Sequence, residues 1–192
     1  DVWEVIEAAA TKPFGFMKFT PGPGLGGHCI PIDPLFLSWK LRSLNYTARF
    51  IDLASEINTG MPRYVVGKIQ EALNNQGKAL KDSKVLILGA AYKPDIDDVR
   101  ESPAIDVIGL LKQSGSQVSY HDPYIAELHD ESYDLASVPD LMKAVSDADC
   151  VVIITNHSQY DYQAIYDKAV CIMDSRNALQ GIGVDDPKVT RL

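Results

Sequence analysis

The second half of the chain alternates between short apolar runs and helical patterns, and this alternation restricts the possible folds more than any other feature. From Lys81 onward the successive segments read "SKVLILGA", "SPAIDVIGLLKQSG", "QVSYHDP", "VPDLMKAVSDA", "DCVVIIT", "YQAIYDKA" and "VCIMDS". They predict four strands separated by helices. Strands joined in this way form βαβ units, which assemble into a parallel sheet with right-handed crossovers. The sequence therefore predicts an α/β fold.

The loops after the predicted strands carry the polar residues that could bind a ligand. A parallel sheet of this kind binds ligands at the carboxyl ends of its strands. We therefore expect one rim to be lined by "GAAYKPDIDDVR", "HDPY", "TNHSQY" and "DSRNAL". The first of these loops lacks the G-x-G-x-x-G fingerprint of dinucleotide sites. This indicates a nucleotide-like fold that does not bind NAD in the usual manner, or a plain α/β domain with a long surface loop.

Residues 1–80 show helical patterns instead, interrupted by one long loop rich in proline and glycine. "DVWEVIEAA" places Val2, Val5, Ile6 and Ala9 on one face, at the spacing of a core-facing stripe. A helix resumes at Asp33, an acid suited to cap it, before a proline at the first helical position. Because the first residues already look like the middle of a helix, we expect the chain to begin inside a larger protein.

A further helix is predicted over about residues 47–75, closed by Gly77. Pro62 should kink this helix or split it in two. Its apolar residues lie on more than one face, which usually means packing on two sides. The helix is therefore the spine of a larger domain, a surface for a partner subunit, or a plain core helix.

Composition restricts the classes of partner. The 192 residues are 46% hydrophobic and 23% charged, enough for a buried core, and the net charge of −8 argues against nucleic-acid and anionic-membrane partners. No apolar run approaches the roughly 20 residues of a membrane span, and no signal peptide opens the chain. Three cysteines show no metal-ligand spacing. Cys150 and Cys171 lie in apolar runs, where we expect buried thiols in a reducing compartment.

The third cysteine, Cys29, lies in the loop "TPGPGLGGHCIPIDP", four residues before Asp33. A thiol near a helix N-terminus can have a lowered pKa and act as a nucleophile. Gly26 and Gly27 allow the backbone to approach a ligand closely. The alternatives are that Cys29 is a packing residue, that Asp33 only caps its helix, and that His28 is a solvated loop histidine.

These motifs together resemble the UDP-glucose/GDP-mannose dehydrogenase family. The resemblance rests on "PGPGLGGHCIPIDP", "EIN" and "MP" in the long helix, "LGAAYKPDIDDVRESPAIDVI", "HDP" and "DSRNAL", and it covers essentially the whole chain. With "TKPFGFM" included, the chain looks most like the UDP-N-acetylglucosamine 6-dehydrogenase branch. Ile32 stands where UDP-glucose dehydrogenases have a lysine, and "KFT" follows "GFM" where this branch has Pro-Phe-Tyr.

The resemblance implies a domain layout. Residues 1–80 would be the C-terminal part of a central helical dimerisation domain, and residues 81–192 a Rossmann-like, parallel-sheet UDP-binding domain. The N-terminal domain that binds NAD, the implied cofactor, would lie outside this chain. The implied partners are a UDP-N-acetyl-hexosamine and a second subunit in a homodimer, with no nucleic acid or membrane. The implied location is the cytoplasm.

The resemblance also implies a mechanism and its residues. The C6 alcohol of the sugar would be oxidised twice, by way of a thioester on Cys29, with Asp33 beside the attacking water. The implied substrate-binding residues are Phe16, Met17, Lys18, Gly26, Gly27, Lys93 and Arg176, Arg100 would reach the cofactor, and no metal is implied. Two other hypotheses stay open: a nucleotide-sugar binding and dimerisation module without catalysis, and a thiol hydrolase using Cys29 and His28.

Overall fold

The computed structural model describes residues 1–130 and 132–192. The helices are α1 (Val2–Ala10), α2 (Asp33–Arg42), α3 (Arg49–Asn75), α4 (Pro103–Gln113), α5 (Leu141–Asp147) and α6 (Tyr162–Lys168). The strands are β1 (Lys84–Leu88), β2 (Gln117–His121), β3 (Glu127–Asp130), β4 (Tyr133–Ala136), β5 (Cys150–Ile153), β6 (Ile172–Asp174) and β7 (Val189–Arg191).

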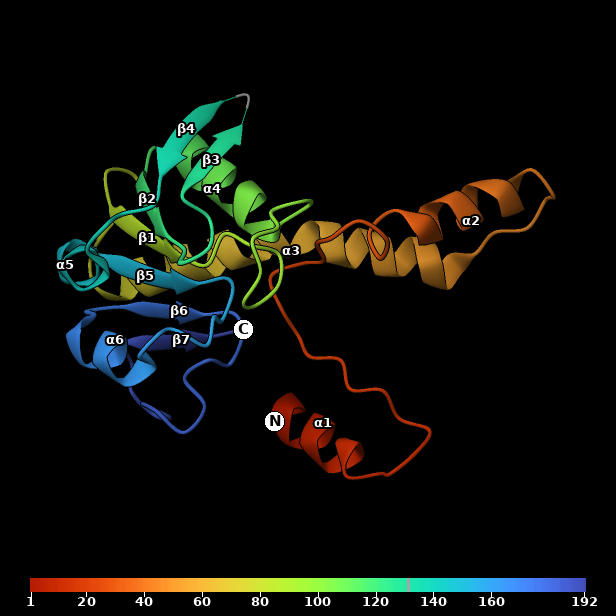
Figure 1. Ribbon diagram of the computed structural model, residues 1–192, viewed down its shortest axis with the longest axis horizontal. Helices are drawn as coiled ribbons and strands as arrows, with labels where there is room; N and C mark the ends of the chain where they lie inside the picture. Colours follow the sequence, from red (N-terminus) through yellow and green to blue (C-terminus); the bar gives the residue numbers. More distant parts are fainter. Residues whose placement is uncertain (131) are drawn as a thin grey trace.

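Five of the strands form one parallel sheet in the order β2-β1-β5-β6-β7. The four predicted strands are β1, β2, β5 and β6, so the predicted fold class is confirmed. Two features were not predicted: β7, a short strand at the sheet edge, and the antiparallel hairpin of β3 and β4. The hairpin projects from the sheet at the top of the view in Figure 1.

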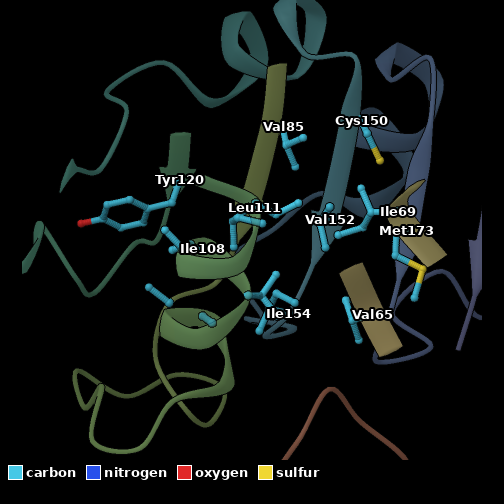
Figure 2. Close-up of a cluster of buried hydrophobic side chains, with 14 of the residues drawn as sticks. Val65, Ile69, Val85, Ile108, Leu111, Tyr120, Cys150, Val152, Ile154 and Met173 are labelled. Atoms are coloured by element: carbon cyan, nitrogen blue, oxygen red, sulfur yellow. The ribbon is translucent and has the colours of Figure 1, made fainter. Parts of the chain in front are cut away.

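Each face of the sheet is covered by a different pair of helices. Alternate side chains of a strand point to opposite faces. Val85 and Ile87 accordingly pack with residues of α3 and α4, whereas Leu86 and Leu88 pack with residues of α5 and α6. Figure 2 shows the first of these layers, with side chains from α3, α4 and the strands meeting in one buried cluster. The helices cover both faces of the sheet, so the loops that follow the strands are left to line its ends.

The long helix α3 joins the two halves of the chain. Its C-terminal half is buried on the sheet through Val65, Ile69 and Leu73. Its N-terminal half projects beyond the sheet and lies beside α2 (Figure 1). The helix is continuous through Pro62, so of the two predicted effects of this proline, a kink or a split, the split is wrong. Packing on both sides of the proline explains this, since α2 supports one half and the sheet supports the other.

Two local expectations for the helices are also wrong. The face of α1 predicted to point into a core is not buried: Val2 is exposed at 50% and Val5 at 65%, Ile6 and Ala9 are only partly covered, and no residue of α1 is buried. Asp33 does not cap α2, because Ile32 occupies the cap position and no side chain bonds there. Asp33 is instead the first residue of the helix, where its negative charge interacts favourably with the positive end of the helix dipole.

Other local predictions hold. Ser102 accepts a hydrogen bond from the backbone amide of Ala104 and so caps α4, with Pro103 as its first residue. Gly77 follows the end of α3 with a φ angle of +71°, a left-handed conformation that favours glycine. Cys150 and Cys171 are buried, as expected. In the part of the chain that the structure describes, no helix is both long and apolar enough to span a bilayer.

Candidate functional site

The candidate site lies at the carboxyl ends of the parallel strands. The predicted rim segments follow β1, β2, β5 and β6 directly, and parallel strands end at the same edge of a sheet. We call residues 89–101 the β1 loop and residues 20–32 the cysteine loop. These two loops contact one another, which brings the cysteine of the first half of the chain to the rim of the second half.

Glycines allow the close approach of the two loops. The amide of Gly27 donates a hydrogen bond of 2.9 Å to the carbonyl of Arg100. A Cβ atom on Gly26 would lie 2.5 Å from Cβ of Tyr92 and 2.8 Å from the carbonyl oxygen of Glu101. Gly27 has a φ angle of +92° and faces the ring of Tyr92. Only glycine at these two positions permits the cysteine loop to rest on the β1 loop.

Cys29 is exposed at the end of this contact. Its sulfur lies 3.8 Å from Nδ1 of His28, so the neighbouring side chains do meet. Its carbonyl accepts hydrogen bonds from the amides of Ile32 (3.2 Å) and Asp33 (2.8 Å). These bonds turn the chain into α2 directly after the cysteine. Asp33 is exposed as well, so thiol and carboxylate are both accessible from solvent.

Arg100 is close to the thiol. Its guanidinium is paired with Asp98, at 2.6 Å between Nη2 and Oδ2. The pKa of Arg100 is raised, first by the hydrogen bonds to Asp98 and, in smaller part, by the charge of Cys29. The β1 loop therefore presents an exposed cation beside its backbone contact with Gly27, two residues before the cysteine.

Arg176 follows β6 and meets the cysteine loop from the other side. A Cβ atom on Gly22 would lie 2.2 Å from Nη1 of Arg176, so the guanidinium lies against the bare backbone of that loop. Burial lowers the pKa of Arg176, against the opposing charge of Asp174. The Asp174 carboxylate also accepts bonds from the amides of Arg176 and Leu179, which hold the loop in place. A half-buried, fixed guanidinium at a rim is suited to an anionic ligand.

The structure does not bring all the predicted residues together. Lys93 is exposed on the β1 loop and, among the described residues, makes no ion pair. Phe16, Met17 and Lys18 are exposed on the segment that links α1 to the cysteine loop, and this segment lies away from the sheet (Figure 1). Lys18 pairs with Glu7 of α1 instead. The site in this structure therefore consists of the cysteine loop, the β1 loop and Arg176.

Sequence reasoning did not single out the buried carboxylate of Asp122, which lies at the centre of the rim. Its Oδ2 accepts hydrogen bonds from the amides of Ala90 (2.6 Å) and Ala91 (3.0 Å) at the start of the β1 loop. Its Oδ1 accepts bonds from the amides of Tyr124 (2.7 Å) and Ile125 (3.1 Å). One carboxylate thus connects the loops that follow β1 and β2.

His157 adds the loop after β5 to this group. Its ring is fully buried, with Nε2 at 3.0 Å from Oδ2 of Asp122. The amide of Asp95 donates to Nδ1 at 3.0 Å. Since Nδ1 accepts, the ring is assigned as the neutral tautomer with its proton on Nε2, and it donates to Asp122. Asp122 lies in the "HDP" segment and His157 in the "TNHSQY" segment. Both segments were predicted to lie at the rim, and this placement was the one sequence signal that could have identified the two residues.

Hydrogen bonding decides the charge of Asp122. Burial alone would raise its pKa, but the bonds from His157 and from the amides of Ala91, Tyr124 and Ala90 outweigh burial and lower the pKa to about 2. The folded protein therefore holds this group as a carboxylate. It stabilises the fold above its ordinary pKa near 4, and the stabilisation is lost as pH falls from about 4 to 2.

A cavity of about 590 Å³ lies beside the site, between the cysteine loop, the first half of α3 and the start of α4. Its wall is largely apolar and includes the carboxylates of Glu101 and Asp106. The pKa of Asp106 is raised by burial, and further by Glu101 and Asp130. Two carboxylates oppose the entry of an anion, so this cavity is less suited to an anionic ligand than the rim near Lys93 and Arg176.

Replacing Asp122 with asparagine should remove most of this pH-dependent stability. We expect Asp122→Asn to lower the free energy of unfolding by about 2–3 kcal/mol at pH 7, with the difference from the unmodified chain shrinking between about pH 4 and pH 2. Urea unfolding at a series of pH values measures this. Asp147→Asn, an exposed carboxylate on α5, is the control and should change stability by less than about 0.5 kcal/mol. A constant difference down to pH 2 would contradict the assignment.

Comparison with known proteins gives two family matches along the chain. Residues 86–181 match the UDP-binding domain of the UDP-glucose/GDP-mannose dehydrogenase family. Residues 1–60 match the central domain of the same family. The second half of α3 lies between the two matched segments, and this part of the helix packs on the sheet.

Individual relatives agree with these matches. The UDP-N-acetyl-D-mannosamine dehydrogenase of Methanocaldococcus jannaschii is 39% identical over 93% of this chain and 40% of its own length. A solved UDP-D-ManNAc dehydrogenase from Pyrococcus horikoshii superposes with a TM-score of 0.76 at 33% identity, over 92% of this chain and 40% of that one. A UDP-glucose dehydrogenase from Pyrobaculum islandicum has a TM-score of 0.79 at 28% identity, over 100% of this chain and 42% of that one.

Proposed function

The chain belongs to the UDP-glucose/GDP-mannose dehydrogenase family, and from that premise we propose that it carries the nucleophile and UDP site of a NAD-dependent UDP-N-acetyl-hexosamine 6-dehydrogenase. The observation that carries the proposal is the exposed thiol of Cys29 on a loop that rests on both the β1 loop and Arg176. The chain spans 40% of the length of its Methanocaldococcus relative, so the activity is proposed for a longer protein.

The proposed chemistry is a double oxidation at C6 of the sugar. The alcohol first loses a hydride and a proton and becomes an aldehyde. The thiolate of Cys29 adds to the aldehyde carbon and forms a thiohemiacetal, which loses a second hydride and a proton and becomes a thioester. Water then breaks the C–S bond, giving the carboxylic acid and the free thiol. The covalent bond retains the reactive aldehyde until the second oxidation.

The residues at the rim would have distinct roles in this scheme. Asp33 would orient the water that attacks the thioester, and its exposure on the first turn of α2 leaves it accessible to that water. Lys93 and Arg176 would bind the diphosphate, for which cationic side chains are suited. Gly26 and Gly27 would provide backbone near the ligand. Phe16, Met17 and Lys18 would hold the uridine only if their segment lies over the rim.

NAD, when bound, supplies the hydride acceptor for both oxidations. Most of its site would lie in a domain outside this chain, in keeping with the β1 loop, which lacks the dinucleotide fingerprint. Arg100 fits a role toward the cofactor, because its guanidinium is 63% exposed and lies near the thiol. Reaction in the cytoplasm is part of the proposal, since NAD and UDP sugars occur together there.

The substrate class follows from the relatives. The Methanocaldococcus and Pyrococcus relatives are named for a UDP-linked N-acetyl-mannosamine. Ile32 also stands in place of the lysine of UDP-glucose dehydrogenases, which favours an acetamido sugar over glucose. We therefore propose a UDP-N-acetyl-hexosamine, and we would assay the full-length protein with the manno, gluco and galacto forms and with UDP-glucose.

Replacing the nucleophile tests the mechanism. In the full-length protein we expect Cys29→Ser to reduce NADH production by about 10³-fold or more, because a hydroxyl at this position is a far weaker nucleophile. The measurement is steady-state NADH absorbance with a UDP-N-acetyl-hexosamine. Cys171→Ser, a change at a buried thiol remote from the rim, is the control and should retain turnover if it folds. Full activity in Cys29→Ser would exclude the thioester route.

A second candidate function is a nucleotide-sugar binding module without catalysis. The observation that favours it is the match of residues 86–181 to the UDP-binding domain of the family, a segment that includes Lys93 and Arg176. Both cations lie in this half, so we propose that it is sufficient to bind the nucleotide.

Calorimetry on the 192-residue chain tests the second candidate. We expect UDP to release heat on binding, and we expect Arg176→Lys to weaken binding by about tenfold or more, because lysine cannot form the bidentate contacts of a guanidinium. Arg63→Lys, at an exposed position of α3, is the matched control. Absence of heat at millimolar UDP would mean that the chain alone is no binding module.

The helical half offers a surface for the proposed homodimer. Phe50, Leu53 and Ile57 of α3 are exposed at 88%, 51% and 56%, and their spacing places them on one side of the helix. On α2, Trp39 is exposed at 71%. Contiguous apolar surface of this kind on paired helices is typical of an interface. We therefore propose that α2 and α3 pair with the same helices of a second copy.

Charge placed on this surface should separate the subunits. We expect the chain, of mass 21.1 kDa, to elute as a dimer, and Phe50→Glu combined with Ile57→Glu to give a monomer. Size-exclusion chromatography with light scattering measures both. Val184→Glu changes an exposed valine far from α3 in the sequence and should leave the dimer intact. A dimer that survives the double substitution would place the interface elsewhere.

A further inference from the structure

A single buried histidine connects three of the rim loops, and the reaction scheme above gives it no role. We propose that His157 is a positioning residue. Through its hydrogen bonds to Asp122 and Asp95 it fixes the conformation of the β1 loop. That conformation directs Lys93 toward the ligand and maintains the contact with the cysteine loop. This inference rests on the proposed function, because it concerns how the UDP site is held in shape.

The first link holds the start of the β1 loop. His157 donates to Asp122, whose same oxygen accepts the amides of Ala90 and Ala91. Thr155, two residues before the histidine, donates a further bond of 2.6 Å from its hydroxyl to the carbonyl of Ala91. The backbone just before Tyr92 is therefore bonded to the loops after β2 and β5.

The second link holds the middle of the β1 loop. The amide of Asp95 donates to Nδ1 of His157, and its carboxylate accepts the amide of Ser158 at 2.9 Å. The bond from Ser158 contributes most to lowering the pKa of Asp95. Asp95 thus donates one hydrogen bond to the loop after β5 and accepts another from it.

Lys93 lies between these two links. It follows Ala91 by two residues and precedes Asp95 by two, so backbone on both sides of it is held. Its own side chain is exposed and, within the described ranges, forms no salt bridge. A fixed backbone with a free ammonium group is the arrangement that preorganises a cation for a ligand at low entropic cost.

The same loop supports the cysteine loop. The amide of Tyr92 donates to the carbonyl of Asp98 at 2.9 Å, which closes the loop on itself. The ring of Tyr92 then faces Gly27, and the carbonyl of Arg100 accepts the amide of Gly27. A shift of the β1 loop would therefore also move the cysteine loop that carries Cys29.

Histidine suits this position because a neutral imidazole donates from one nitrogen and accepts at the other. Two substitutions separate these functions. The amide nitrogen of glutamine can replace Nε2, so His157→Gln keeps a donor toward Asp122 and loses the acceptor for Asp95. The amide oxygen of asparagine can replace Nδ1, so His157→Asn keeps the acceptor for Asp95. This pair tests the link to the middle of the β1 loop.

The experiment measures UDP affinity of the 192-residue chain by calorimetry, with each substitution alone and combined with Lys93→Ala. We expect Lys93→Ala to weaken binding about tenfold and His157→Gln to weaken it about fivefold, with no further loss when the two are combined. His157→Asn should retain affinity within about twofold, because Asp95 keeps its acceptor and Asp122 still accepts the amides of Ala90 and Ala91 directly. If His157→Gln weakened UDP binding by the same factor in the unmodified chain and in the Lys93→Ala variant, the proposal would be overturned, because a residue with a merely structural role acts independently of the lysine.

A ligand-free measurement separates this inference from the proposed function. Amide hydrogen exchange of the folded chain should be faster at Asp95 in His157→Gln, because its amide loses its acceptor, and close to the unmodified chain in His157→Asn, with β5 unchanged in both. Unchanged exchange in His157→Gln would overturn the positioning role. If the unmodified chain binds no UDP while exchange responds as expected, the UDP site fails and the loop-holding role stands.

Discussion

The buried carboxylate of Asp122 is the interaction on which the rim depends. It accepts four backbone amides from the loops after β1 and β2, and the imidazole of His157 from the loop after β5. An ionised group tolerates burial only when hydrogen bonds replace its lost hydration. These five donors meet that requirement, and the same bonds hold together loops that would otherwise be independent surface turns.

The cysteine loop and the sheet form one site because α3 is shared by both halves. The C-terminal half of α3 is part of the core of the α/β sheet, whereas its N-terminal half packs against α2, which begins four residues after Cys29. A rigid helix therefore sets the distance between the cysteine loop and the strand ends. The glycines at positions 22, 26 and 27 then allow contact with Arg176 and Tyr92.

Most of the α/β half could be predicted from the sequence, because apolar runs such as residues 85–88 are long enough to specify a buried strand. The edge strand β7 and the β3–β4 hairpin lack such a signal, since their residues are only partly buried and form no continuous apolar run. In the first half, the pattern correctly located α1 but not the exposure of its apolar face. Periodicity indicates which residues share a face, and it does not indicate whether another element covers that face.

For the site, the sequence by itself determined which residues carry reactive and charged groups: Cys29 between glycines and a helix start, and Lys93, Arg100 and Arg176 after predicted strands. Only the tertiary structure decided which of them meet. It put Arg176 against Gly22 and placed His157 between Asp122 and Asp95, residues far apart along the chain. The physical reason is that hydrogen bonds between loops depend on the order of strands in the sheet, which local sequence patterns do not encode.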